Sequence, residues 1–189
     1  MTLRELKEDV EYWCADSNGW IRLPVLLLIL HQSYQQIKDP WWDGLFSALD
    51  FGVHELGHVI FSPFGEFMGI FGGSFWQLAA PIITAIMFYR QRDYFAISVA
   101  SMWLGISLFR MAVYMEDART MQLPLMGVGG GGEAWHDWNY MFTDFRVLQH
   151  DWKIALATRS VGKLFLVFAM VSGTWMIYRM FRSVETNES

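Results

Sequence analysis

Two histidines and a glutamate within the five positions 54–58, which read His-Glu-Leu-Gly-His, are the residues of this chain most clearly suited to chemistry. The apolar residues around them predict a helix, and a spacing of four residues places His54 and His58 on one helix face. Two imidazoles at this spacing can share a zinc ion, and Glu55 beside them is placed to take a proton from water. The pattern predicts His54 and His58 as metal ligands and Glu55 as a catalytic base.

A catalytic zinc site takes a third protein ligand and leaves its fourth position for water. The remaining histidines are His31, His136 and His150. We expect His136 to be the third ligand, because it lies shortly after the glycine run 129–132, which can fold back toward a buried site at little steric cost. The adjacent Asp137 is the alternative ligand or a group that orients the ligand, and Asp117 is a further candidate. The competing interpretation of His136 is a surface histidine in an aromatic loop.

Other polar and glycine residues lie close to this motif in the sequence. Asp50 is one helical turn before His54, where it either orients the imidazole through its second ring nitrogen or contacts water near the membrane surface. Gly72 and Gly73 open a later apolar run, and packing is the ordinary interpretation of both. The alternative is that these glycines let backbone approach the zinc, with Gln77 adding a polar contact.

The composition predicts lipid as the solvent for most of the chain. Of the 189 residues, 53% are hydrophobic and 17% aromatic, and only 17% are charged, compared with about 25% charged in ordinary soluble domains. A domain of this size leaves roughly 30% of its unfolded surface exposed, which is too much for so many large apolar side chains. We therefore expect an all-α, polytopic integral membrane protein.

The apolar stretches predict four transmembrane helices, or five if a short stretch also crosses. The four are 67–89, with helix beginning near Ser74 after the glycine pair and Pro81 inside it; 94–109 extended past Arg110; 164–178; and 45–61. The short stretch is 21–30, whose length favours an interfacial or re-entrant segment. Arg110 interrupts an apolar run, so we expect it to have an acidic partner or to reach a headgroup.

We expect a single membrane domain over 1–189, with a polar, amphipathic N-terminal helix in 1–20 and an extramembrane or re-entrant loop in 116–160. With four spans, one side collects Arg4, Lys7, Arg22, Lys38, Arg90, Arg92, Arg179 and Arg182, and the other collects Arg119, Arg146, Lys153 and Arg159. This imbalance predicts that both termini are cytoplasmic. We assign the chain to a bacterial cytoplasmic (inner) membrane.

Several classes of function are excluded by the residues present. A net charge of −5 with scattered Lys and Arg argues against a nucleic-acid partner. The glycine run 129–132 lacks a preceding strand and the Gly-Lys-Ser/Thr ending of a phosphate loop, which argues against a nucleotide. A single cysteine excludes an intrachain disulfide and a multi-cysteine metal site. The expected partners are the lipid bilayer and a membrane-protein or peptide substrate.

The helix 45–61 and, loosely, the glycine turn and helix after it resemble the membrane-embedded zinc metallopeptidases of the site-2 protease type. The resemblance implies that His54 and His58 bind zinc, that Glu55 is the catalytic carboxylate, and that peptide bonds in or near the bilayer are cleaved. That family takes its third ligand from an Asn-Pro…Asp-Gly motif on a later helix. No such motif follows position 58 here, and the one Asp-Gly pair, Asp43-Gly44, precedes it.

Together these features predict a membrane-embedded zinc metallohydrolase, specifically a peptidase that uses zinc-activated water. The first alternative is a membrane metal-binding or transport protein, which would need no carboxylate base. The second is a catalytically inactive scaffold of the zincin type. A further, plain interpretation is that the three residues are packed polar groups that hydrogen-bond between helices.

Overall fold

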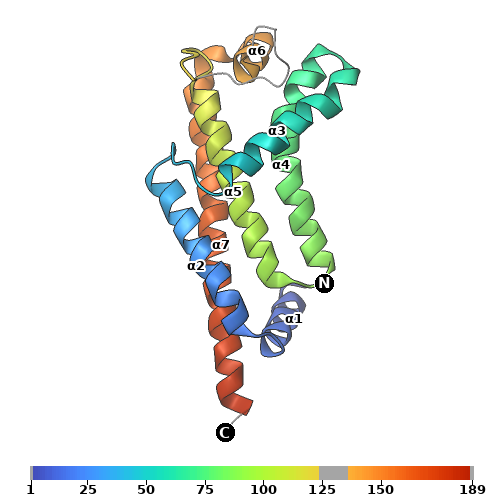
Figure 1. Cartoon of the computed structure of the whole chain (residues 1–189), viewed down its shortest axis with the longest axis vertical. Helices are drawn as coiled ribbons and strands as arrows, with labels where there is room; N and C mark the ends of the chain where they lie inside the picture. The colour runs from blue at the N-terminus through green and yellow to red at the C-terminus, as the bar shows by residue number, and fades with distance from the viewer. Residues whose placement is uncertain (1, 124–135, 188–189) are drawn as a thin grey trace.

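The computed structural model describes residues 2–123 and 136–187, and its secondary structure in these ranges is entirely helical (Figure 1). The elements are α1 (Leu3–Ala15), α2 (Gly19–Lys38), α3 (Ser47–Phe61), the 3₁₀ turn η1 (Ser62–Phe64), α4 (Glu66–Arg90), α5 (Tyr94–Glu116), α6 (Asp137–Asp144), the 3₁₀ turn η2 (Leu148–His150) and α7 (Asp151–Asn187). The expected all-α class is therefore confirmed.

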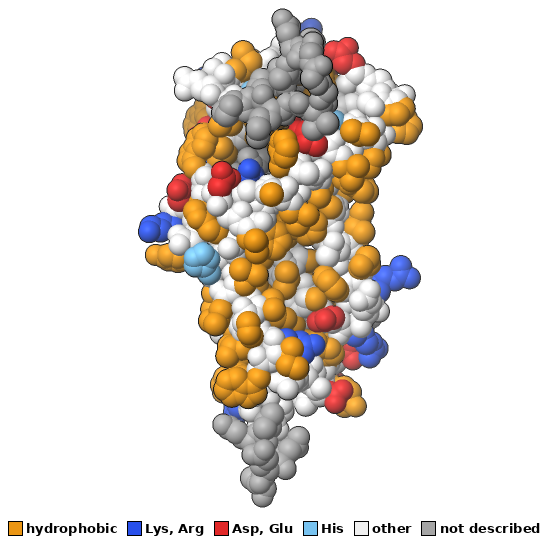
Figure 2. Space-filling view, in the orientation of Figure 1, with side chains coloured by type: hydrophobic (Ala, Val, Ile, Leu, Met, Phe, Trp, Pro, Cys, Tyr) orange, Lys and Arg blue, Asp and Glu red, His pale blue; other side chains and the backbone are white. Residues whose placement is uncertain are grey.

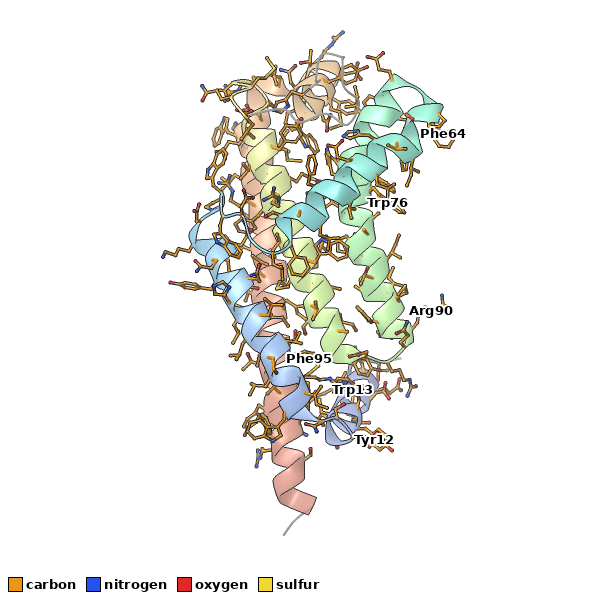
Figure 3. All side chains as sticks on the ribbon, viewed as in Figure 1. Tyr12, Trp13, Phe64, Trp76, Arg90 and Phe95 are labelled. Atoms are coloured by element: carbon orange, nitrogen blue, oxygen red, sulfur yellow. The ribbon has the colours of Figure 1, made fainter. Side chains whose placement is uncertain are left out.

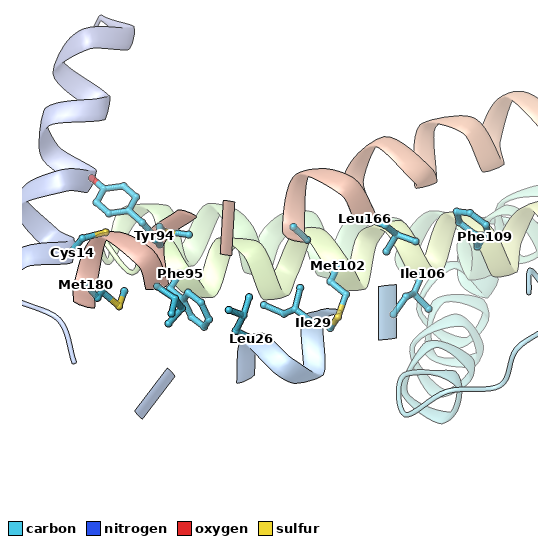
Figure 4. Close-up of a cluster of buried hydrophobic side chains, with 13 residues drawn as sticks. Cys14, Leu26, Ile29, Tyr94, Phe95, Met102, Ile106, Phe109, Leu166 and Met180 are labelled. Atoms are coloured by element: carbon cyan, nitrogen blue, oxygen red, sulfur yellow. The ribbon is translucent and has the colours of Figure 1, made fainter. Parts of the chain in front are cut away.

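The long helices α5 and α7 pack side by side along the molecule and form its core, with α2 on one flank and α4 on the other (Figure 1). Buried apolar side chains from α2, α5 and α7 meet in one cluster, which includes Ile29, Met102 and Leu166 (Figure 4). Gly105 and Gly162 lie at the crossing of α5 and α7, where a Cβ on either would be 3.0 Å from the carbonyl oxygen of the other. Small residues thus allow close backbone approach, as at many helix contacts in membranes.

Three helical segments are long and apolar enough to cross a membrane: Glu66–Arg90, Tyr94–Glu116 and Leu148–Ser183. Figure 2 shows hydrophobic side chains over much of the visible face between the two ends of the molecule. These segments support a membrane protein. The helix α3 has 15 residues, about 22 Å at 1.5 Å per residue, and is too short to cross about 30 Å of hydrocarbon. The segments 45–61 and 21–30, expected as a fourth span and an optional fifth, are thus not among these three.

The helix α4 begins at Glu66, eight residues before the start near Ser74 that the glycine pair predicted. That start was wrong, because Gly72 and Gly73 continue the helix and face α3 instead of ending a turn. Pro81 lies inside the helix and is buried. Figure 3 places Phe64 near the beginning of α4 and Arg90 at its other end, with Trp76 between them.

The segment predicted at 164–178 is the middle of a helix of 37 residues, α7. Lys163 and Arg179, which flank the predicted segment, lie inside this helix. Asp151 opens the first turn of α7 and is fully buried, where its carboxylate accepts a hydrogen bond from Arg119 Nε at 2.6 Å. The helix therefore extends well beyond the apolar run that first identified it.

The N-terminal residues form α1, which a capping box between Thr2 and Glu5 begins. Asp9 of α1 pairs with Arg92 and accepts a hydrogen bond from the Tyr94 hydroxyl, which ties α1 to the connection between α4 and α5. Both ends of the described chain lie away from α6 (Figure 1). That the two termini face the cytoplasm stays a prediction.

Arg110 has the acidic partner that its position required. Its Nη1 donates to Asp43 Oδ1 at 2.6 Å and to Ser47 Oγ at 3.0 Å. These contacts join the C-terminal third of α5 to the first residue of α3 and to the segment that precedes it. The prediction of a protein partner for this arginine is confirmed.

Candidate metal centre

The His-Glu-Leu-Gly-His motif lies on one arm of a tight helical hairpin formed by α3, η1 and α4. Gly65 joins η1 to α4 at φ +106°, a conformation that side chains with a Cβ rarely adopt. Gly57 and Gly72 face each other across the hairpin, where a Cβ on Gly57 would lie 2.2 Å from the Gly72 carbonyl oxygen. The two helices can therefore pack at backbone contact.

His54 and His58 turn the same ring atom toward each other. Their Nε2 atoms are 3.0 Å apart, and both side chains are largely shielded, with 13% and 27% of their surface exposed. The second ring nitrogen of each histidine faces an oxygen: Nδ1 of His58 is 2.8 Å from the Gly69 carbonyl, and Nδ1 of His54 is 3.1 Å from Gln77 Oε1. Because these oxygens only accept, each Nδ1 supplies the hydrogen of its contact, and both Nε2 atoms face inward.

Asp137 completes this arrangement from α6. Its Oδ2 lies 3.1 Å from Nε2 of His54 and 3.3 Å from Nε2 of His58, and its side chain is 8% exposed. Burial raises the pKa of Asp137, but hydrogen bonds from His54 and His58 outweigh burial and hold the pKa of this carboxyl below its ordinary value. The carboxylate is thus kept in its charged form.

Contacts with the end of α5 fix the position of Asp137. Its backbone N–H donates to the Tyr114 hydroxyl at 3.1 Å, and two residues later Asn139 Nδ2 donates to the Ala118 carbonyl at 2.8 Å. As the first residue of α6, Asp137 also places its negative charge at the positive end of that short helix. The carboxylate is therefore positioned by the protein.

The three inward atoms fit a zinc ion. Ligands about 2.0–2.1 Å from a tetrahedral zinc lie about 3.3 Å from one another, and the observed separations are 3.0, 3.1 and 3.3 Å. Two imidazoles and one carboxylate form a common set of zinc ligands. Outward hydrogen bonds from the metal-binding histidines are likewise a usual feature of such sites.

Glu55 lies beside this set. A carboxylate oxygen of Glu55 and a ring nitrogen of each histidine lie within 4.8 Å of one another. The Glu55 side chain is half-buried, so it borders the site without being closed off from solvent. A carboxylate in this position is suited to accept a proton close to the metal ligands.

The structure brings Asp137, and not His136, to the two histidines. Nδ1 of His136 accepts the Asn139 backbone N–H at 3.2 Å, and its Nε2 is 3.4 Å from Asp117 Oδ2. Within the described residues neither ring nitrogen has a contact with His54 or His58. Burial lowers the pKa of His136, and the negative charge of Asp117 opposes that effect. His136 therefore acts here as the N-cap of α6.

Asp117 does not join the site, because backbone N–H groups and a hydroxyl surround it. It accepts hydrogen bonds from Thr120, Gln122 and Leu123. Burial raises the pKa of Asp117, but these hydrogen bonds lower it by more, so the pKa lies below its ordinary value. Its oxygens hold the chain that leaves α5.

Asp50 does not touch His54 either. Its Oδ1 accepts hydrogen bonds from Trp103 Nε1 at 2.7 Å and Ser107 Oγ at 2.8 Å. Its side chain is 1% exposed, so the expectation that it contacts water at the membrane surface does not hold. Gln77, considered in the sequence only as one alternative, is the side chain that contacts Nδ1 of His54.

Sequence reasoning did not identify the Gly69 carbonyl or the Tyr114 hydroxyl. A backbone carbonyl carries no residue signal, and Tyr114 lies in an apolar run where an aromatic residue is ordinary. The glycine run 129–132, expected to bring His136 to the site, lies outside the described residues.

Comparison with protein-family models, with curated proteins and with solved structures finds no match for this chain. The function proposed below therefore rests on the residues of the site and their geometry.

Proposed function

We propose that this chain is an integral membrane zinc metallohydrolase in which His54, His58 and Asp137 hold the metal and Glu55 is the catalytic base. One observation carries the proposal. Two imidazole Nε2 atoms and one carboxylate oxygen converge within 3.0–3.3 Å, while the second nitrogen of each ring is held by an outward hydrogen bond. Two neutral imidazoles and a carboxylate that face one point are a ligand set that a shared cation stabilises.

A zinc ion held there would supply a Lewis acid that lowers the pKa of water and polarises a carbonyl. Glu55, next to the ligands but outside their close triangle, would accept the proton of the attacking water and pass it to the leaving group. Asp137 would keep the charge of the ligand set negative. We propose peptide bonds as the substrate class, in keeping with the site-2 protease resemblance of the motif.

We further propose that the centre lies within or at the edge of the bilayer. Apolar side chains on the outer side of α3 are exposed, among them Leu49, Leu56, Val59 and Ile60, and lipid is the solvent that such side chains favour. In this arrangement α2, with 20 residues, is the fourth span and α3 enters the bilayer without crossing it. We place both termini in the cytoplasm of a bacterial cell.

The test combines zinc content with hydrolysis. Detergent-purified wild type is expected to hold about one zinc per chain by elemental mass spectrometry, and His58→Ala is expected to lose it. Glu55→Gln should keep the zinc but lose at least 100-fold in hydrolysis of a peptide or membrane-protein substrate that the wild type cleaves. Absence of zinc from the wild type after zinc is supplied would overturn the proposed centre. Full hydrolysis by Glu55→Gln would overturn the role of Glu55.

A further inference from the structure

The proposed metal centre lies close to one end of the long helix α4. The Gly69 carbonyl is 2.8 Å from Nδ1 of His58, and Gly73 packs against both histidine rings. These two glycines are three and seven residues after Glu66, where α4 begins, and 21 and 17 residues before Arg90, where it ends. At about 1.5 Å per residue, the centre is about 5–10 Å along the helix axis from the first end and about 26–32 Å from the second.

The helix α5 places the centre at the same end of the molecule. The Tyr114 hydroxyl accepts the backbone N–H of Asp137, the proposed ligand from α6. Tyr114 is two residues before the end of α5 at Glu116 and 20 residues after its start at Tyr94. These separations correspond to about 3 Å and about 30 Å along the axis. The start of α4 and the end of α5 both lie toward α6 (Figure 1).

The opposite end holds both ends of the described chain. Asp9 of α1 contacts Arg92 and Tyr94, where the chain passes from α4 to α5. Arg179, in the last part of α7, is 3.4 Å from Glu11 of α1. Figure 1 shows that α1 and the C-terminal end of α7 both lie away from α6. The molecule therefore has one end with the metal centre and another with the two termini.

A bilayer around this molecule has to lie between the two ends. Over 67–89 of α4 and 94–115 of α5 the one charged side chain is Arg110, and it is paired with Asp43. Charged residues flank both stretches, and these are Glu66, Arg90, Asp93 and Glu116. Because hydrocarbon disfavours unpaired charge, the two stretches mark the part of the molecule that lipid surrounds. The metal centre is then close to the membrane surface on the α6 side.

The exposure of the site residues indicates that the centre opens toward that surface. His58, one helical turn closer to η1 than His54, has 27% of its side chain exposed, compared with 13% for His54. Toward the middle of the bundle, Gln77 and Asp50 are buried. Access from the side of the two termini would therefore have to pass the packed interior of the helices.

We infer that the metal centre opens on the side of the membrane opposite to both termini, and that the polypeptide segments it cleaves are presented on that side. With the termini in the cytoplasm, as the excess of Lys and Arg at their end predicts, this is the outer surface of the cytoplasmic membrane. The substrate rests on the proposed function, whereas the position of the centre relative to the termini does not.

Cysteine labelling tests where the two ends lie. The chain has one cysteine, Cys14, which is 1% exposed. Burial raises the pKa of its thiol to about 11, and the thiolate is the reactive form, so the wild type gives a low background. Thr143→Cys adds an exposed thiol on α6, and Gln91→Cys, the matched control, adds one in the connection between α4 and α5.

In right-side-out membrane vesicles, a charged maleimide is expected to label Thr143→Cys roughly tenfold or more faster than Gln91→Cys, because a charged reagent crosses hydrocarbon slowly. The order should reverse in inside-out vesicles. Labelling of both thiols from the same side would overturn the inference. Labelling of Gln91→Cys alone in right-side-out vesicles would overturn the assignment of the centre to the outer surface.

Metal removal tests the opening of the centre. EDTA, a charged chelator, is added to vesicles that contain the zinc-loaded wild type, and the remaining zinc is measured by elemental mass spectrometry. Right-side-out vesicles are expected to lose zinc roughly tenfold or more faster than inside-out vesicles. Equal loss, or faster loss from inside-out vesicles, would overturn the inference. A wild type that binds no zinc would instead overturn the proposed function, and the two cysteine variants would still decide where the two ends lie.

Discussion

Gly73 of α4 lies directly against the ring of His58. A Cβ built on Gly73 would be 2.5 Å from Nε2 and 2.6 Å from Cε1 of His58, and 2.9 Å from Cε1 of His54. These distances are far shorter than van der Waals contact, so the two imidazoles can hold their positions only if residue 73 has no side chain. The second arm of the hairpin thus forms one wall of the proposed metal centre.

Gly73→Ala is therefore expected to weaken zinc binding at least tenfold. The methyl group must displace the rings, and His58 cannot move without losing its hydrogen bond to the Gly69 carbonyl. Zinc affinity by chelator competition measures the effect. The control is Gly52→Ala on α3, where a Cβ would have no neighbour within 4 Å.

Gly52→Ala should leave zinc affinity unchanged and stabilise the helix by about 0.5–1 kcal/mol. Equal zinc affinity in Gly73→Ala and Gly52→Ala would contradict the close packing of Gly73 on the histidines.

Asp137 and His136 are expected to respond differently to alanine substitution. Asp137→Ala removes one of the three converging atoms and should abolish stoichiometric zinc. His136→Ala should keep about one zinc per chain and lose about 1 kcal/mol of stability, because an N-cap hydrogen bond to Asn139 is lost. Elemental mass spectrometry and thermal unfolding measure the two effects. Loss of zinc in His136→Ala with zinc retained in Asp137→Ala would restore His136 as the ligand.

His136 and Asp137 show which part of the site the sequence could not predict. The spacing of His54 and His58 is local to one helix, so their shared face could be predicted from the motif. The choice between positions 136 and 137 depends on how α6 docks, through Tyr114 on α5 and Ala118 just after that helix. Those contacts join residues about 20 positions apart and leave no pattern in the sequence.

The glycine pair shows a second limit. Glycine is unfavourable inside a helix by about 0.5–1 kcal/mol, so Gly72 and Gly73 predicted a later helix start. The helix continues because both residues pack on α3. A Cβ added on Gly72 would lie 2.6 Å from the Gly57 carbonyl oxygen, and Gly73 lies against the two histidines. Packing between α3 and α4 thus outweighs the low helix propensity of glycine. The apolar runs that form α4, α5 and α7 could be recognised in the sequence.

Tyr114→Phe is expected to lower zinc affinity by about tenfold. The Tyr114 hydroxyl accepts the backbone N–H of Asp137, and without it that buried N–H has no acceptor, which costs about 1–3 kcal/mol. The cost falls on the position of Asp137, so the metal centre should weaken while helical content by circular dichroism stays constant. The control is Tyr12→Phe, at an exposed tyrosine on α1. Unchanged zinc affinity in Tyr114→Phe would mean that Asp137 is held in place by its other contacts.

The Arg110–Asp43 pair should make stability depend on pH in a defined direction. The hydrogen bond from Arg110 holds the pKa of Asp43 below its ordinary value of 3.8. A carboxyl with a lowered folded pKa stabilises the protein above its unfolded pKa, and this contribution disappears as pH falls below 3.8 toward the folded value. Asp43 is 78% exposed on its side chain, so the contribution is less than about 1 kcal/mol.

Asp43→Asn should therefore unfold at a slightly lower temperature than wild type at pH 6, and the unfolding temperatures of the two proteins should converge as pH falls below 3.8. Asp16→Asn, at an exposed residue after α1, is the control and should follow the wild type throughout. A constant difference between Asp43→Asn and wild type over this range would show that the ion pair does not set the titration of Asp43.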